Sequence, residues 1–180
     1  YELDGVIIMG TGHQPTPMVL AGKALADITR FIKGDRYRSR LISKIMFGAY
    51  NKRIKNVRTS NDWLTRDETV VDEYNAGKLT TFLFTVNGYR GLMNMILYVR
   101  KPRNIAKIPK NLPMLMVSGL DDPVGEYGKG VYRAYNTYHG HIDDIDLRLF
   151  EDCRHELCNE LNKEEIYEEI YGWIMDHMNK

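Results

Sequence analysis

Met114-Leu115-Met116-Val117-Ser118-Gly119-Leu120-Asp121-Asp122-Pro123-Val124 is the stretch of sequence that decides the fold. Its first four residues are apolar without interruption, as in a strand, and a short loop with two acids follows. Residues 147–150 form a second apolar run that leads into a loop containing His155. The carboxyl ends of parallel strands meet at one edge of a sheet, so we expect the acid and the histidine to lie close together.

Strand patterns and helix patterns alternate around these loops. Residues 6–9 are apolar and are followed by glycines, which predicts a strand that ends in a tight turn. Apolar residues recur at helical spacing within residues 18–32, 41–46, 92–99, 131–138 and 166–174, and residues 145–149 alternate as a strand does. Asn162 with Glu165 resembles a capping box at the start of the last helix. This order predicts an α/β fold with a parallel sheet and helices on its faces.

Composition indicates one ordinary globular chain. The chain has 180 residues, 43% of them hydrophobic and 27% charged, with a net charge of +1. No apolar run is long enough to span a membrane and no signal-peptide pattern is present, so we expect a cytoplasmic protein without a transmembrane segment. The two cysteines lack disulfide or CxxC spacing, which favours reduced thiols.

Positive charges concentrate in the first 110 residues and negative charges in the remainder. Residues 36–40 and 52–55 are the basic clusters where a nucleic acid would be sought. Apolar residues at helical spacing are interleaved with them, including Leu41 and Ile45. We therefore interpret the charges as the solvated face of an amphipathic helix and expect no nucleic-acid partner.

Asp122 and His155 are the residues that carry the predicted chemistry. Asp122 would accept a hydrogen bond from one ring nitrogen of His155 and stabilise the imidazolium, while the other nitrogen takes and returns a nucleophile's proton. An acid followed by a histidine is the order of an α/β-hydrolase triad, in which the nucleophile comes first. The sequence contains no GxSxG, and none of its serines lies between glycines.

The chain resembles α/β-hydrolases of the monoacylglycerol lipase, lysophospholipase and serine aminopeptidase type. The resemblance depends on residues 118–125 as the acid loop, residues 154–160 as the histidine loop, and cap-like residues 63–67 and 71–74. It implies the carboxyl-terminal part of an α/β-hydrolase, with parallel strands, flanking helices and a helical cap insertion. The expected organisation is a core strand and loop at 1–17, the cap at 18–100, and core strands and helices at 101–180.

The same resemblance implies a serine hydrolase that cleaves carboxylic esters, plausibly lipid monoesters, through an acyl-enzyme. Asp122, which directly precedes Pro-Val, takes the acid position, and His155 takes the base position. The nucleophile serine and the oxyanion hole would come from a missing amino-terminal half, which would also place a parallel strand beside residues 6–9, since so apolar a strand should not be an open edge. No cofactor and no metal are implied.

Aromatic and methionine side chains in residues 18–100 suit an apolar substrate pocket. The candidate substrate contacts are Phe47, Trp63, Phe82 and Met93. The alternative for each is that it only packs the cap onto the sheet.

Simpler interpretations of the two loops remain open. The pair Asp121 and Asp122 before a proline is typical of a turn or a helix cap, and a histidine beside Glu156 is typical of a surface residue. These acids and His155 could alternatively bind a metal ion, although no ligand spacing supports it. Cys153 or Cys158 could replace the serine, and the whole chain could be an inactive, hydrolase-like binding module.

Overall fold

Three parallel strands form the sheet of the protein in a computed structural model that describes residues 3–178. The elements, in chain order, are β1 (Val6–Met9), α1 (Thr16–Lys33), α2 (Arg40–Phe47), the 3-10 helix η1 (Tyr50–Arg53), α3 (Glu68–Ala76), α4 (Val86–Val99), α5 (Pro102–Ile105), β2 (Met114–Gly119), α6 (Lys129–His139), β3 (Ile145–Phe150), the 3-10 helix η2 (Leu157–Asn159) and α7 (Lys163–Met178). The strand order is β1-β2-β3, and every residue of the central strand β2 is buried. The predicted parallel sheet is confirmed.

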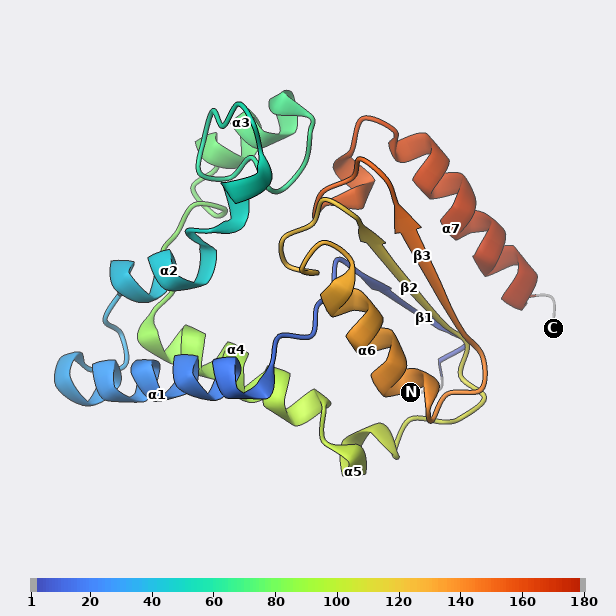
Figure 1. Cartoon of the computed structure of the whole chain (residues 1–180), viewed down its shortest axis with the longest axis horizontal. Coiled ribbons are helices and arrows are strands. Elements are labelled where there is room, and N and C mark those ends of the chain that lie inside the picture. Colours follow the sequence, from blue (N-terminus) through green and yellow to red (C-terminus); the bar gives the residue numbers. More distant parts are fainter. Residues whose placement is uncertain (1–2, 179–180) are drawn as a thin grey trace.

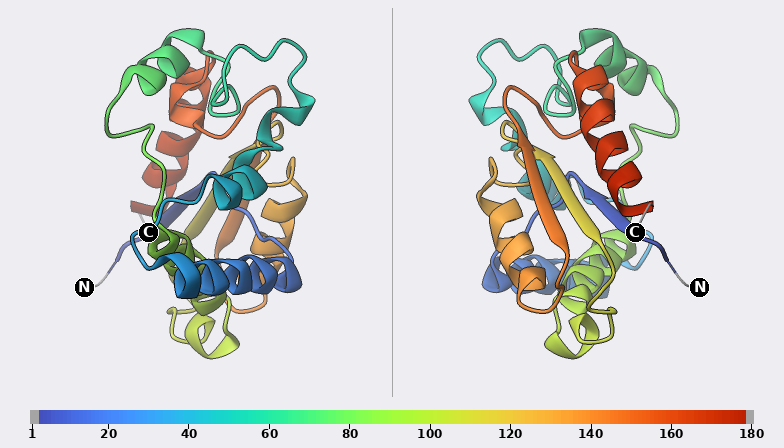
Figure 2. Two further views of the ribbon diagram at one scale, coloured as in Figure 1. Left: turned by 90° about the vertical axis from the view of Figure 1, so that its left-hand side faces the viewer. Right: turned by 90° about the vertical axis from the view of Figure 1, so that its right-hand side faces the viewer.

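Helices cover both faces of this sheet. Successive side chains of a strand point to opposite faces, so β2 contributes to two cores. Leu115 packs in a core with Trp173 of α7, and Met116 packs in another with Ala134 of α6. Figure 2 shows α6 and α7 on opposite sides of the strands. The α/β architecture expected from the sequence is therefore present.

The helices α1 to α5 lie between β1 and β2 in the sequence. Figure 1 shows α1, α2 and α3 to one side of the sheet, and α1 lies along α4. A separate core of Ala26, Ile42, Val86 and Tyr89 holds this group of helices together. Of the helices within residues 3–178, none combines the length and apolar character needed to cross a membrane.

The amphipathic pattern of α2 differs from the expectation. Ser39 caps the helix by accepting a hydrogen bond from the backbone N–H of Ile42 at 3.2 Å, and Ile42 is buried. Leu41 and Ile45, which were expected opposite the charged face, are 61% and 60% exposed. Ile42 is buried in the core shared with α1 and α4, and Met46 and Phe47 of α2 pack against this core while partly exposed.

Strand β1 is an edge strand in residues 3–178. It pairs with β2 on one side, in a register that places Val6 beside Met114, and no described residue pairs with its other side. Ile7 and Met9 are 37% and 38% exposed. The further strand expected beside β1 is not supplied by these residues and stays a prediction.

Candidate active site

Asp122 and His155 are in contact at the carboxyl ends of the strands. Asp122 follows β2 and is completely buried, and His155 follows β3. Nδ1 of His155 lies 3.0 Å from Oδ2 of Asp122. A carboxylate only accepts hydrogen bonds, so in the neutral ring Nδ1 carries the proton and Nε2 presents a lone pair. Nε2 makes no hydrogen bond within residues 3–178. Asp121, which precedes Asp122 in the sequence, is exposed.

The acid loop fixes the direction of the Asp122 carboxylate. Its Oδ1 accepts a hydrogen bond from the backbone N–H of Val124 at 2.8 Å. The Ser118 hydroxyl, which is also completely buried, lies 3.5 Å from Oδ2. Ser118 is thus placed against the acid and not in the position of a nucleophile. The remaining lone pairs of Oδ2 face His155.

Gly10 and Trp63 enclose the imidazole from two other elements. Gly10, at the end of β1, has φ +62°, and a Cβ atom there would lie 3.0 Å from Cε1 of His155. The ring of Trp63, between η1 and α3, has its centroid 5.2 Å from that of His155 at an angle of 44°. Gly10 was not predicted as a site residue, although the glycines after the first apolar run were a signal of close backbone approach.

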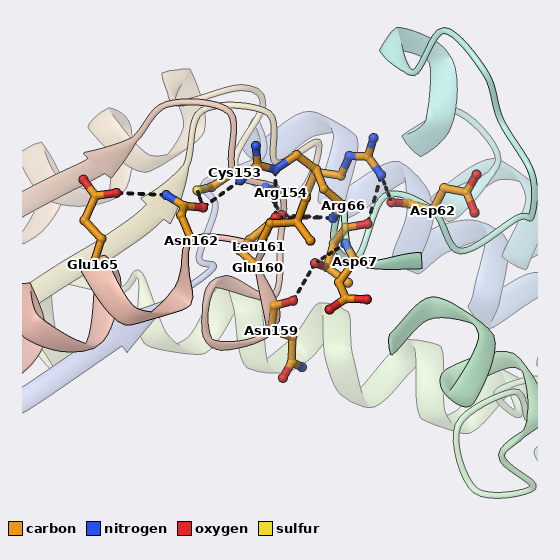
Figure 3. Close-up of polar contacts among 11 residues, drawn as sticks. Asp62, Arg66, Asp67, Cys153, Arg154, Asn159, Glu160, Leu161, Asn162 and Glu165 are labelled. Carbon is orange, nitrogen blue, oxygen red and sulfur yellow. Dashed lines mark hydrogen bonds and ion pairs between the residues drawn. The ribbon is translucent and has the colours of Figure 1, made fainter. Parts of the chain in front are cut away.

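The histidine loop is held by a polar network that Figure 3 shows. Glu160, whose side chain is completely buried, accepts hydrogen bonds from the backbone N–H of Arg154 at 2.7 Å and from Nε of Arg66 at 2.9 Å. Arg66 was not predicted from the sequence, because its partner lies 94 residues along the chain. Glu160 within the histidine loop was the available signal, since a carboxylate that becomes buried requires a partner.

A groove of about 710 Å³ lies among the helices between β1 and β2. Phe47, Trp63 and Phe82, all named as candidate substrate contacts, line it. Met93 does not line it: its side chain is buried between α4 and α1, where it lies against Gly22, and its contact with substrate stays a prediction. Met93 faces α1 because that side of α4 forms the helix–helix contact. Trp63 connects the groove to the imidazole.

Tyr50 adds a hydroxyl group beside the site. Its ring contacts Trp63 edge-to-face, with a centroid distance of 4.9 Å. Burial, assisted by the negative charge of Asp122, raises the pKa of Tyr50 to about 12. The phenol therefore stays protonated at neutral pH and is available as a hydrogen-bond donor.

The two thiols have the properties of packing residues. Cys153 is completely buried, and burial, together with the charge of Glu160, raises the pKa of its thiol. Burial also raises the pKa of Cys158. Because the thiolate is the nucleophilic form, these shifts disfavour either cysteine as a replacement for serine.

The cluster in residues 3–178 that could hold a metal ion is remote from His155. Asp144, Asp146 and His177 place their ligand atoms within 4.8 Å of one another. They lie at the start of β3 and the end of α7, at the opposite end of the strand from His155. Nε2 of His177 is 3.4 Å from Oδ2 of Asp144, a contact that ties α7 to the sheet. Asp122 and His155 do not belong to this cluster.

Comparison with known proteins places the chain. A sequence model of the family described as serine aminopeptidase, S33 matches residues 1–162. The fold is similar to a thermostable carboxyl esterase from Bacillus coagulans (TM-score 0.82, 22% identity, 98% of this chain and 56% of that chain) and to a lipase in its open form (0.80, 22%, 99% and 58%). It is also similar to a monoglyceride lipase from Saccharomyces cerevisiae (TM-score 0.68, 17% identity, 98% of this chain and 54% of that chain). No curated protein gives a significant match.

The chain thus spans 56% and 58% of the length of the first two structures. The family match extends over most of the sequence, from β1 to the loop that precedes α7. The resemblance noted from the acid and histidine loops is confirmed by this match. The chain belongs to the serine aminopeptidase S33 family of α/β-hydrolases.

Proposed function

We propose that the chain is the carboxyl-terminal part of a serine hydrolase that cleaves carboxylic esters, with Asp122 as the acid and His155 as the base. The observation that carries this proposal is the 3.0 Å contact between Nδ1 of His155 and the buried carboxylate of Asp122. This contact leaves the lone pair of Nε2 available to accept a proton. The raised thiol pKa values of Cys153 and Cys158 favour a serine nucleophile from outside this sequence.

The reaction then proceeds in two half-reactions, acylation and deacylation of the serine. Nε2 of His155 takes the proton of a serine hydroxyl as its oxygen attacks the ester carbonyl, and Asp122 stabilises the imidazolium. The imidazolium returns the proton to the departing alcohol, which leaves an acyl-serine. Water repeats the sequence and releases the acid. This chemistry requires neither a cofactor nor a metal ion.

The amino-terminal part of the fold is the proposed partner of this chain. It would supply the serine, the backbone N–H groups that bind the oxyanion, and a parallel strand beside β1. Within residues 3–178 no strand pairs with the outer edge of β1, and this supports the arrangement, because an apolar edge strand is a site for strand pairing.

Lipid monoesters are the proposed substrates, and residues 18–100 the proposed cap over the site. The groove supports an acyl chain because aromatic side chains, including Phe47 and Phe82, line it, and Trp63 joins it to His155. The monoglyceride lipase among the similar structures is consistent with this class.

A cytoplasmic location also stays a prediction, for cell fractionation to test.

A fluorophosphonate probe, which labels activated serines, tests the proposal on the complete protein. We expect labelling of the parent and its loss in the His155→Ala variant. Equal labelling of both proteins, or labelling of neither, would rule out the proposed serine hydrolase activity. A degenerate sequence in place of GxSxG upstream of Tyr1, together with no labelling, would favour the alternative, an inactive binding module.

A further inference from the structure

Two segments that are far apart in the sequence are bonded to each other around the histidine. Residues 62–66 belong to the helical region before α3, and residues 154–160 form the histidine loop. The backbone N–H of Glu156 donates to the carbonyl of Leu64 at 2.7 Å, and the hydroxyl of Thr65 donates to the carbonyl of Asn159 at 2.8 Å. Figure 3 shows the two segments side by side, so the helical region and the histidine loop form one unit here.

The Glu160 carboxylate lies at the centre of this unit. Its side chain has no exposed surface, and its Oε1 accepts the backbone N–H of Arg154 at 2.7 Å. Its Oε2 accepts Nε of Arg66 at 2.9 Å, and the backbone N–H of Arg66 lies 3.3 Å from both oxygens. A buried carboxylate is tolerated only when its oxygens have such charged or polar donors. Glu160 therefore requires both segments to be in place.

Hydrogen bonds fix the backbone of the two residues that flank His155. The preceding residue, Arg154, donates its N–H to Glu160, and the following residue, Glu156, donates its N–H to Leu64. The guanidinium of Arg154 also donates to two backbone carbonyls, those of Asp62 at 2.6 Å and Thr65 at 2.9 Å. The turn between these two carbonyls carries Trp63, whose ring lies against the imidazole.

We propose that Glu160 is a positioning residue for His155. Through Arg66 and Arg154 it fixes the turn that carries Trp63 to the histidine loop, so the imidazole is held against Asp122 with one tautomer and one orientation. The inference deepens the proposed function and depends on it for its kinetic consequence. The turn at Trp63 is accordingly a fixed wall of the groove and not a mobile lid.

The test is a Glu160→Gln substitution in the complete protein. The glutamine NH₂ group would face N–H donors of Arg66 or Arg154, so the two segments must separate. A displacement of about 1 Å of a reacting group costs about 100-fold in rate. With a short-chain p-nitrophenyl ester we expect kcat to fall by about this factor, while KM changes less than about threefold, because a short acyl group makes little contact with the groove.

Two further variants serve as a milder perturbation and as a control. Arg66→Gln removes the ion pair but keeps the backbone bonds to Glu160, so its loss in kcat should be smaller. Asp27→Asn is the matched control, because it removes an ion pair with Arg90 that joins α1 to α4 away from the histidine loop. Its kcat should equal that of the parent.

Nitrogen NMR of the His155 imidazole supplies a readout that does not need turnover. In the neutral form of the ring, the parent should show a proton on Nδ1 alone, and Glu160→Gln a mixture of Nδ1–H and Nε2–H forms. A parent-like kcat and tautomer in Glu160→Gln would overturn the inference, as would equal losses of activity in Glu160→Gln and Asp27→Asn. If Glu160→Gln does not fold, Arg66→Gln decides by the same two measurements. A parent that hydrolyses no ester would defeat the proposed function, while the tautomer comparison would still test the role of Glu160.

Discussion

Replacing Asp122 by asparagine should reverse the tautomer of His155. In the structure Oδ1 of Asp122 accepts the backbone N–H of Val124 at 2.8 Å, and Oδ2 accepts Nδ1–H of His155 at 3.0 Å. Asparagine has the same size but only one oxygen, and the N–H of Val124 requires that oxygen. The NH₂ group then faces His155, whose Nδ1 must become an acceptor, so the proton moves to Nε2.

The expected loss of activity is large. A ring with its proton on Nε2 cannot accept the proton of the serine, and amide replacement of a triad acid costs about 10⁴-fold in kcat. At about 1.36 kcal/mol per factor of ten, this is about 5.5 kcal/mol of transition-state stabilisation. Asp122 is completely buried, so water cannot restore the lost hydrogen bond. The measurement is steady-state hydrolysis of a short-chain ester by the complete protein, with nitrogen NMR of His155 to identify the tautomer.

Asp121→Asn is the matched control, because Asp121 is the adjacent and exposed acid. Its kcat should remain within about twofold of the parent, as for most surface substitutions. The reasoning would be refuted if Asp121→Asn lost activity while Asp122→Asn kept it. It would equally be refuted if Nδ1 of His155 kept its proton in Asp122→Asn.

Three further predictions concern the surroundings of the site. Gly10→Ala should lower kcat and destabilise the fold by about 1–2 kcal/mol in urea unfolding, because φ is +62° and the new Cβ would lie 3.0 Å from Cε1 of His155. In the control Gly140→Ala the new Cβ would meet nothing within 4 Å, so neither kcat nor stability should change. Phe82→Ala should raise KM about tenfold for long-chain esters and leave short-chain esters unchanged, if this groove binds the acyl chain. Since burial raises the pKa of the Cys153 thiol above its ordinary 9.0, iodoacetamide should label it at pH 8 only after unfolding, and its contribution to stability should be lost as the pH rises above 9.0.

The sequence alone was sufficient to predict the sheet and the two loops that meet at its edge. The apolar run at the start of residues 114–124 predicts a strand, and it is present as the fully buried β2. The topology of parallel strands then required Asp122 and His155 to follow neighbouring strands at the same edge. These features follow from local patterns, because the types of consecutive residues indicate a strand and the turn that follows it.

The tertiary structure alone decided how the site is enclosed. Met93 and Trp63 are both apolar cap residues in the sequence, yet Met93 is buried against α1 and Trp63 lies against His155. The ion pair between Arg66 and Glu160 joins residues separated by 94 positions. Such contacts depend on the packing of whole segments against one another, and no local pattern of residue types specifies which side chains will then face each other.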